Sequence, residues 1–457
     1  MGATRAHRHR SVRAPMTTNA SMRPERILNV YVALTLLSTF ASSFIWGINT
    51  LFLLDAGLSV TQAFAANAFF TLGEVIFEVP TGVVADTWGR RASYLLGAAT
   101  LLVSTLLYLL MWRIHGPFWA WALCSILLGL GFTFFSGATE AWLVDGLSAT
   151  RYAGTLESAF ARGQVATGAG MLTGTVTGGI IAQATNLGGP YALRAAVLGV
   201  TFIVAFLWMR DVGFKPRRAT SVVGEMRSVL EASLDRGLRN PPVRWTMLAG
   251  LFSYGVPIYG FYAMQPYLLE LYGRSDYTIA GLAAALVAAC QILGAFIVPW
   301  ARKVFRRRTS ALLFGSVASV GALLAMGLSS SFWVVLAVLA LWALVFAAAR
   351  PIRQAFLNEL IPSAQRATVL SSDNLLGSLG GVMAQPALGR VADVLGYPTS
   401  YVAAAGVELL AWPFLLLARR ERAPSDPIPG AREATPRPLE RRGAAGRSAE
   451  AVEGRSR

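Results

Sequence analysis

The sequence predicts an all-α membrane protein in which twelve transmembrane helices form two halves of six. Of the 457 residues, 54% are hydrophobic and only 14% are charged, whereas soluble domains carry about 25% charged residues. A single soluble core stops growing near ~250–300 residues and could not bury so much apolar surface. The apolar residues also form continuous runs without alternation, which favours helices over a membrane barrel.

Each apolar run is long enough to cross a membrane, because roughly 20 helical residues span ~30 Å of hydrocarbon. In chain order the predicted helices are 27–54, 60–84, 92–112, 117–147, 155–183, 189–210, 244–271, 276–300, 309–329, 332–360, 367–392 and 398–418. A polar stretch after the sixth helix divides the chain into two six-helix halves, 27–210 and 244–418.

Three segments lie outside the predicted helices. Residues 1–26 are basic and lack the pattern of a cleavable signal peptide, so we expect a cytoplasmic tail and insertion by the first helix. In the linker 211–243, Val222, Met226 and Leu230 share one face, which indicates a short amphipathic helix on the membrane surface. Residues 419–457 are rich in Pro, Gly and charge, which predicts disorder.

The net charge of +16 follows membrane topology and does not indicate nucleic-acid binding. Lys and Arg gather in the two tails, the linker and the turns on the same side, which is typical of cytoplasmic loops. We therefore expect a multi-pass protein of the cytoplasmic membrane with both termini in the cytoplasm and the lipid bilayer as its partner. Of the 40 basic residues, the opposite side receives only Arg113, Arg194, Arg274 and Arg390.

No cofactor or metal is expected. The two cysteines, Cys124 and Cys290, lie inside predicted helices without metal-ligand spacing, and we interpret them as packing residues. The chain is expected to be a monomer.

A repeat relates the two halves. Residues 139–147 (TEAWLVDGL) and 353–361 (RQAFLNELI) are both apolar stretches that end near an acid, Asp145 or Glu359. Residues 82–91 (GVVADTWGRR) and 294–303 (GAFIVPWARK) both begin with Gly and end with basic residues. Such repeats are typical of secondary transporters, whose binding sites lie between the halves near the bilayer midplane.

The stretch GVVADTWGRRASYL resembles the signature loop of the major facilitator superfamily, with Gly82, Asp86, Gly89, Arg90 and Arg91 in the matching positions. The resemblance extends over residues 27 to 418 and implies a small-molecule transporter that works by alternating access. The stretches FEVPTG and ATEAWLVD resemble a bacterial branch that includes drug exporters.

In that family the loop acid holds the two halves together in the outward-open state. The resemblance implies that Asp86 reaches the start of the eleventh helix, that Arg90 reaches Asp145, and that a basic residue of the second half reaches Glu359. Alternatively, the arginines only anchor the loop to the cytoplasmic side. We call this set the gate latch: Gly82, Asp86, Gly89, Arg90, Arg91, Asp145, Arg302, Lys303 and Glu359.

Glutamates inside the membrane indicate a function, because inserting an ionised side chain there costs ~2.5–3.5 kcal/mol of free energy on insertion scales. Loss of water favours their protonated form, which suits proton coupling. Glu74 has no basic residue in its helix, whereas Glu78 lies near the latch, where a structural role is equally expected. Glu140 could instead pair with Arg162. The coupling candidates are Glu74, Glu140, Glu78 and Glu408.

The fifth helix contains GAGMLTGTVTGG, in which Gly170, Gly174 and Gly178 share one face and permit close helix packing. The stretch resembles the antiporter motif of the family, except that Thr175 replaces a proline. The packing role holds with or without antiport.

Substrate contacts are expected on the first helix of each half and at the intramembrane arginines. Aromatic and amide groups suit a small molecule with apolar and polar parts, although Tyr254 and Tyr259 could instead belong to the interfacial aromatic belt. The candidates are Ser43, Trp46, Asn49, Arg162, Tyr254, Tyr259, Tyr262, Gln265, Arg350 and Arg353.

The sequence therefore predicts a proton-coupled secondary transporter that exports a small molecule. Two alternatives are proton-coupled uptake of a metabolite and a transporter-like sensor without transport activity. An enzyme is not expected, because His7, His9 and His115 lie outside the helices and neither a Gly-x-Ser-x-Gly motif nor a phosphate loop occurs.

Overall fold

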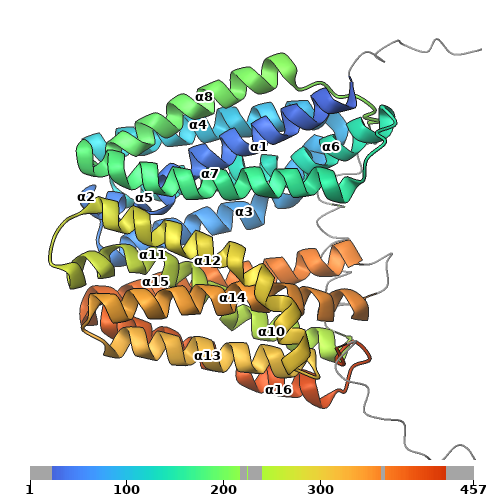
Figure 1. Ribbon diagram of the computed structural model, residues 1–457. Helices are drawn as coiled ribbons and strands as arrows, with labels where there is room; N and C mark the ends of the chain where they lie inside the picture. Colours follow the sequence, from blue (N-terminus) through green and yellow to red (C-terminus); the bar gives the residue numbers. More distant parts are fainter. Residues whose placement is uncertain (1–22, 217–223, 225–238, 362–365, 429–457) are drawn as a thin grey trace, which may run out of the picture.

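The computed structural model describes residues 23–216, 224, 239–361 and 366–428. Helices α1 to α8 form one bundle and helices α10 to α16 form a second bundle beside it (Figure 1). The described residues contain no β-strand, only an isolated bridge between Arg307 and Pro427. The predicted all-helical fold class is confirmed.

The first bundle consists of α1 to α8 and includes the glycine-rich helix α7. Ser59 starts α3 with a capping box, in which its hydroxyl accepts from the Gln62 amide and the Gln62 side chain accepts from the Ser59 amide. The helices are α1 (Pro24–Trp46), α2 (Asn49–Asp55), α3 (Val60–Trp88), α4 (Arg90–Ile114), α5 (Phe118–Phe135), α6 (Ala138–Ala149), α7 (Leu156–Ala184) and α8 (Gly188–Trp208).

Four long helices of the second bundle contain internal prolines, and only α13 among the long helices does not. The prolines are Pro266 in α11, Pro299 in α12, Pro351 in α14, and Pro386 and Pro398 in α15. The helices are α10 (Pro241–Ser253), α11 (Gly255–Tyr272), α12 (Tyr277–Val304), α13 (Arg308–Leu328), α14 (Phe332–Leu360), α15 (Arg366–Leu409) and α16 (Trp412–Arg420).

Eleven helical stretches of the described chain are long and apolar enough to cross a membrane, and the last one is long enough to cross twice. That stretch, Val369–Arg420, has 52 residues, which would extend about 78 Å as one helix, far beyond ~30 Å of hydrocarbon. It turns back at Gly396, whose φ of 84° is left-handed. Twelve crossings bring both described ends to one face, here named the terminal face (Figure 1).

Three predicted spans are broken where the sequence predicts single helices. The first span divides at Gly47 between α1 and α2, the fourth at Gly137 between α5 and α6, and the seventh at Tyr254 between α10 and α11. Gly137 has a φ of 67°, so the backbone itself leaves the helical path there.

The end of the described chain is ordered where the sequence predicts disorder. Residues 421–428 fold back against the turn between α12 and α13. The Asp426 side chain accepts a hydrogen bond from the Thr309 amide at 2.9 Å, and the Ile428 amide donates to the Arg306 carbonyl at 3.1 Å. Asp426 thereby satisfies free amides at the start of α13. The expected linker helix and both outer tails, 1–22 and 429–457, lie outside the described residues.

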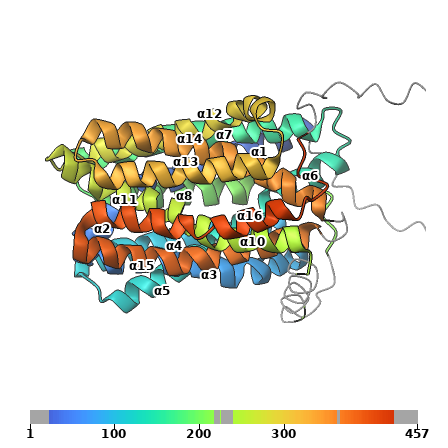
Figure 2. The ribbon, with the colours of Figure 1, turned by 90° about the horizontal axis from the view of Figure 1, so that it is seen from below.

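The two bundles touch along two pairs of helices. Figure 2 shows α7 and α12 along one edge and α3 and α15 along the other. The first pair packs through glycines, since a Cβ on Gly281 would lie 2.7 Å from the Thr175 carbonyl oxygen and 2.9 Å from the Gly179 Cα. Within the first bundle, Gly170, Gly174 and Gly178 of α7 lie against α1, as a small-residue packing face requires.

Candidate functional site

A cavity of 290 Å³ is lined by residues of the first bundle and by Tyr262 of the second bundle. We call it the central cavity. Aromatic side chains form much of its wall, and two ionisable side chains, Glu74 and Arg194, face it. Its lining residues are Ile45, Trp46, Asn49, Asn67, Phe70, Glu74, Tyr108, Leu128, Phe132, Arg194 and Tyr262.

Arg194 occupies a different place from the one that the charge pattern predicts. The sequence places it in the loops opposite the termini, but in α8 its side chain is only 1% exposed and lines the central cavity. The guanidinium carbon lies 5.8 Å from the centre of the Phe132 ring. Its Nε and Nη2 atoms have no hydrogen-bond partner among the described residues. A buried charge without partners is costly, so this arginine needs an explanation.

Two asparagines form the polar part of the wall. The Asn49 amide nitrogen donates to Asn67 Oδ1 at 2.9 Å, and the Tyr191 hydroxyl donates to Asn49 Oδ1 at 2.8 Å. These bonds fix the orientation of Asn49 and leave Asn67 Nδ2 without a partner among the described residues. The cavity therefore presents unused buried hydrogen-bond donors from Asn67 and Arg194.

Glu74 stands between the central cavity and a second cavity of 430 Å³. We call the second one the terminal-side cavity, because it is lined by Glu78, Ser136 and residues of α15 near its start at the terminal face. Glu74 and Phe132 line both cavities, so the cavities are adjacent. Glu78 is exposed there and accepts a hydrogen bond from the Ser136 hydroxyl at 3.1 Å.

On the face opposite the termini, hydrogen bonds join the two bundles. The Gln265 side chain accepts from the Thr50 amide at 2.9 Å and donates to the Trp46 carbonyl at 2.7 Å. Nearer that face, Thr61 donates to Asp393 at 2.7 Å. The structure is thus closed on the opposite face and hollow on the terminal side. Gln265, expected to contact substrate, uses both ends of its amide to close the bundles.

The latch loop is organised within the first bundle. Arg90 pairs with Asp86 at 2.7 Å and lies 3.8 Å from Asp145, so the expected contact between Arg90 and Asp145 is present as a long ion pair. The expected contact of Asp86 with the start of α15 is not seen. Its carboxylate is turned to Arg90, and the side chains of residues 366–368 lie outside the described residues.

Asp211, which the sequence analysis passes over, completes the latch loop. Its Oδ1 accepts a hydrogen bond from the Arg91 amide at 2.9 Å and so caps α4. Burial raises the pKa of Asp211, although that hydrogen bond and the charges of Arg91 and Arg90 act against the rise. Gly89 has a φ of 109°, and a Cβ there would lie 2.3 Å from Asp211 Oδ2. Gly82 is exposed, with nothing within 4 Å of a Cβ, so no close packing requires a glycine at this position in this structure.

In the second bundle Glu359 has a partner outside the predicted latch set. Glu359 is held by Arg308, whose two terminal nitrogens each donate to it at 2.6 Å. Arg308 Nη1 also donates to the Ser425 carbonyl at 2.6 Å, which ties the ordered end of the chain to this pair. Lys303 is exposed on α12, and the side chain of Arg302 lies outside the described residues. Three arginines run together at 306–308, and nothing in the sequence singles out the last one.

Arg353 and Tyr254, expected to contact substrate, belong to a closed polar cluster. Arg353 Nη2 donates to Asp373 at 2.6 Å and to the Thr246 carbonyl at 3.1 Å, and Nη1 donates to the Tyr254 hydroxyl at 2.9 Å. Asp373 is only 3% exposed. This bidentate pair joins α14 to α15. It cannot be predicted from the sequence, because the two residues lie in different predicted helices.

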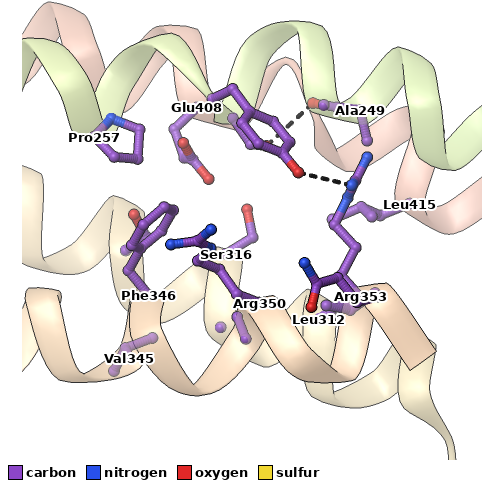
Figure 3. Close-up of a pocket in the computed structure, with 17 residues that line it drawn as sticks. Ala249, Pro257, Leu312, Ser316, Val345, Phe346, Arg350, Arg353, Glu408 and Leu415 are labelled. Carbon is purple, nitrogen blue, oxygen red and sulfur yellow. Dashed lines mark hydrogen bonds between the residues drawn. The ribbon is translucent and has the colours of Figure 1, made fainter. Parts of the chain in front are cut away.

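The second bundle has a cavity of its own, shown in Figure 3. We call this space of 100 Å³ the lateral cavity; its lining residues belong to the second bundle alone. Glu408 and Arg350 point into it from facing helices (Figure 3). Glu408 is 5% exposed, its Oε2 atom has no partner among the described residues, and Ser253 and Ser316 line the cavity with it.

Several other expected site residues lie away from these cavities. Ser43 is buried against Gly174 and donates to the Thr39 carbonyl, and Tyr259 is buried in the second bundle, where it donates to Ser400. Glu140 and Arg162 are both exposed, and the structure, which describes both, gives no ion pair between them. Of the expected substrate contacts, Trp46, Asn49 and Tyr262 line the central cavity.

The profile of the Major Facilitator Superfamily matches residues 31–309 and 275–450. This chain belongs to that superfamily. It is a membrane transporter of the major-facilitator type, as the signature loop and the twelve crossings predict.

Known proteins resemble it at a distance. The uncharacterized MFS-type transporter YxaM of Bacillus subtilis (strain 168) is 22% identical over 394 residues, covering 83% of this chain and 92% of that protein. The nucleoside transporter NupG has a TM-score of 0.70 at 12% identity, covering 86% of this chain and 98% of NupG. A D-xylose-proton symporter has a TM-score of 0.62 at 18% identity, covering 86% and 98%. At these identities the two structures establish the fold alone.

Proposed function

We propose that this transporter exports a small organic molecule in exchange for protons, with Glu74 as the residue that carries the proton. One observation supports this above the others. Glu74 lies at the boundary of the central and terminal-side cavities, and both cavities have walls from both bundles. A movement of one bundle against the other therefore changes which side Glu74 can reach.

The proposed cycle uses the closed and hollow faces of the structure. The charge distribution supports a cytoplasmic terminal face, so the state described here faces the cytoplasm. Substrate enters the central cavity through the terminal-side cavity while Glu74 releases its proton. Breaking the Gln265 and Thr61 contacts opens the opposite face, where substrate leaves and Glu74 takes up a proton.

Among the four coupling candidates the geometry favours Glu74. Glu140 is exposed and Glu78 is exposed beside Ser136, so neither requires a shift in protonation between the two states. Glu408 faces a cavity walled by the second bundle alone, whose exposure would not change when the bundles move against each other. Glu74 alone of the four lines both of the cavities that have walls from both bundles.

Export is supported by the resemblance of the fifth helix and of FEVPTG to drug exporters. Thr175, in place of the motif's proline, favours the second candidate function, which is proton-coupled uptake. Its hydroxyl donates to the Met171 carbonyl at 2.8 Å within α7, so the helix is continuous at this point. The direction of proton movement on adding substrate separates these two functions.

The test is a proton-flux assay in proteoliposomes that contain a pH-sensitive dye. The panel comprises ethidium and tetraphenylphosphonium as cations, benzoate as an anion, L-phenylalanine as a zwitterion, and D-xylose and uridine as neutral molecules. We expect at least one compound to move protons opposite to itself in vesicles with protein and not in empty vesicles. Protein-dependent movement of a compound without protons would contradict coupling, and no protein-dependent movement at all would contradict transport of this class.

A further inference from the structure

The central cavity presents an acid and a base that do not pair with each other. Both Glu74 and Arg194 line it, yet the structure, which describes both residues, gives no ion pair between them. By contrast Arg308, which is 6% exposed, pairs with Glu359. The lateral cavity also contains an acid and a base, the described residues Glu408 and Arg350, without an ion pair between them, but its walls come from the second bundle alone.

The donors of the cavity call for an acceptor with negative charge. Arg194 Nε and Nη2 and Asn67 Nδ2 are buried without partners, and all three belong to side chains that line the same space. Each buried donor without a partner costs ~1–3 kcal/mol, and more where the group is charged. A carboxylate satisfies such donors, because it is acceptor-only and pairs with guanidinium in bidentate geometry.

The carboxylate of Glu74 is suited to a positively charged group of the ligand. A protonated amine can take the place of the proton on Glu74, so that substrate and proton exclude each other there. Between the two polar ends the wall is aromatic, with Trp46, Phe70 and Phe132. These faces suit an apolar or aromatic body and can also attract a cation.

We propose that the central cavity selects small zwitterionic molecules, with an anionic group at Arg194, an ammonium group at Glu74 and an apolar body against the aromatic wall. This inference rests on the proposed function, because it takes the central cavity as the transport site. It also gives a physical reason for exchange, since the ammonium group and the coupling proton compete for one carboxylate.

Three probes with one phenyl body test the proposal: L-phenylalanine carries both charges, 3-phenylpropionate only the carboxylate, and phenethylamine only the amine. Binding is measured on the full chain in detergent, without any gradient, by the shift in thermal unfolding with ligand concentration. We expect L-phenylalanine to bind at least ~10-fold more tightly than either single-charge probe, because each loses one charge-assisted hydrogen bond.

Substitutions assign each charge to its residue. Arg194→Gln should weaken L-phenylalanine and 3-phenylpropionate by about 10-fold and leave phenethylamine unchanged, whereas Glu74→Gln should weaken only the two amines. Arg113→Gln, in the exposed last turn of α4, is the matched control and should change none of the three. Equal binding of all three probes, no binding of any, or insensitivity to Arg194→Gln would overturn the proposal.

The two proposals can fail separately. Proton movement that depends on Glu74, together with equal binding of the three probes, would overturn the selection of zwitterions and leave proton-coupled transport supported. Selective binding through Arg194 without any proton movement in proteoliposomes would support the selection of zwitterions and overturn proton coupling.

Discussion

Two buried arginines, one in each bundle, show how differently the same side chain can be used. Arg353 in the second bundle donates to Asp373, Tyr254 and the Thr246 carbonyl, so its charge is neutralised within the protein. Arg194 in the first bundle is more deeply buried, at 1% exposed against 14% for the Arg353 side chain, yet two of its nitrogens have no partner among the described residues. A satisfied buried charge stabilises a fixed arrangement, whereas an unsatisfied one beside a cavity indicates a ligand.

The cavities also differ in whether one bundle or both bundles form their walls. The lateral cavity is walled by the second bundle alone, whereas the central and terminal-side cavities have walls from both bundles. Alternating access needs a site that the two bundles share. This difference supports the proposal that substrate passes through the central and terminal-side cavities, while the Arg353 cluster stabilises the second bundle.

The largest expected effect comes from exchanging the two arginines for methionine. Arg353→Met leaves Asp373 buried without its partner and should destabilise the fold by ~3–5 kcal/mol. Arg194→Met removes an unsatisfied charge and should raise the thermal stability of the ligand-free protein. Melting temperatures of the purified variants in detergent measure both effects. Equal losses in the two variants would show that Arg194 is also structural.

The second effect compares two glycines of the latch. Gly89→Ala forces a side chain into a φ of 109° and against Asp211, which we expect to cost ~1–3 kcal/mol. Gly82→Ala meets open space and should change stability by less than ~0.5 kcal/mol. Thermal unfolding measures both. A slowed transport rate in Gly82→Ala at unchanged stability would show that Gly82 approaches another helix when the terminal face closes.

A smaller effect is expected for the ion pairs of the latch. Arg90 and Asp145 lie 3.8 Å apart and are partly exposed, so their coupling in a double-mutant cycle of stability should be below ~1 kcal/mol. In the transport rate, each single charge removal should impair function, and exchanging the two charges should restore part of it. Strictly additive rates would show that the arginine only anchors the loop.

The smallest effect is a pH dependence from Asp211. Its pKa is raised in the folded protein, so the folded state binds its proton more tightly than the unfolded state does. Stability therefore falls as the pH rises from the ordinary value near ~3.9 through the raised pKa, and is constant above it. Asp211→Asn should flatten this part of the profile of melting temperature against pH. A profile with the same slope in both proteins would assign the dependence to another group.

The sequence predicts much of the fold and little of the site. Twelve apolar runs predict twelve crossings, because membrane thickness sets helix length. The helix breaks at Gly47, Gly137 and Tyr254 are not predicted, since such short interruptions leave the hydropathy of the run unchanged. The latch loop is predictable because its residues are consecutive. Asp211 and Arg308 are not, because their partners lie far away in the chain.

Arg194 shows the limit most clearly. Its position near the start of a predicted helix fits a loop or interface arginine, and only packing against Phe132 and the surrounding helices reveals that it is buried. Glu74 can be proposed as a coupling residue from the sequence, because the lack of a basic neighbour in its helix is visible there. The adjacency of two cavities around it is a property of the assembled bundles.

The central claim is that Glu74 couples protons to transport, and two matched variants test it directly. In vesicles with an imposed proton gradient, accumulation of the compound that moves protons with the parent protein is measured for Glu74→Gln and Glu408→Gln, together with exchange of labelled for unlabelled compound. We predict that Glu74→Gln retains exchange and loses accumulation, because it mimics the protonated state permanently, while Glu408→Gln retains both. Accumulation by Glu74→Gln at the level of the parent protein would contradict the account.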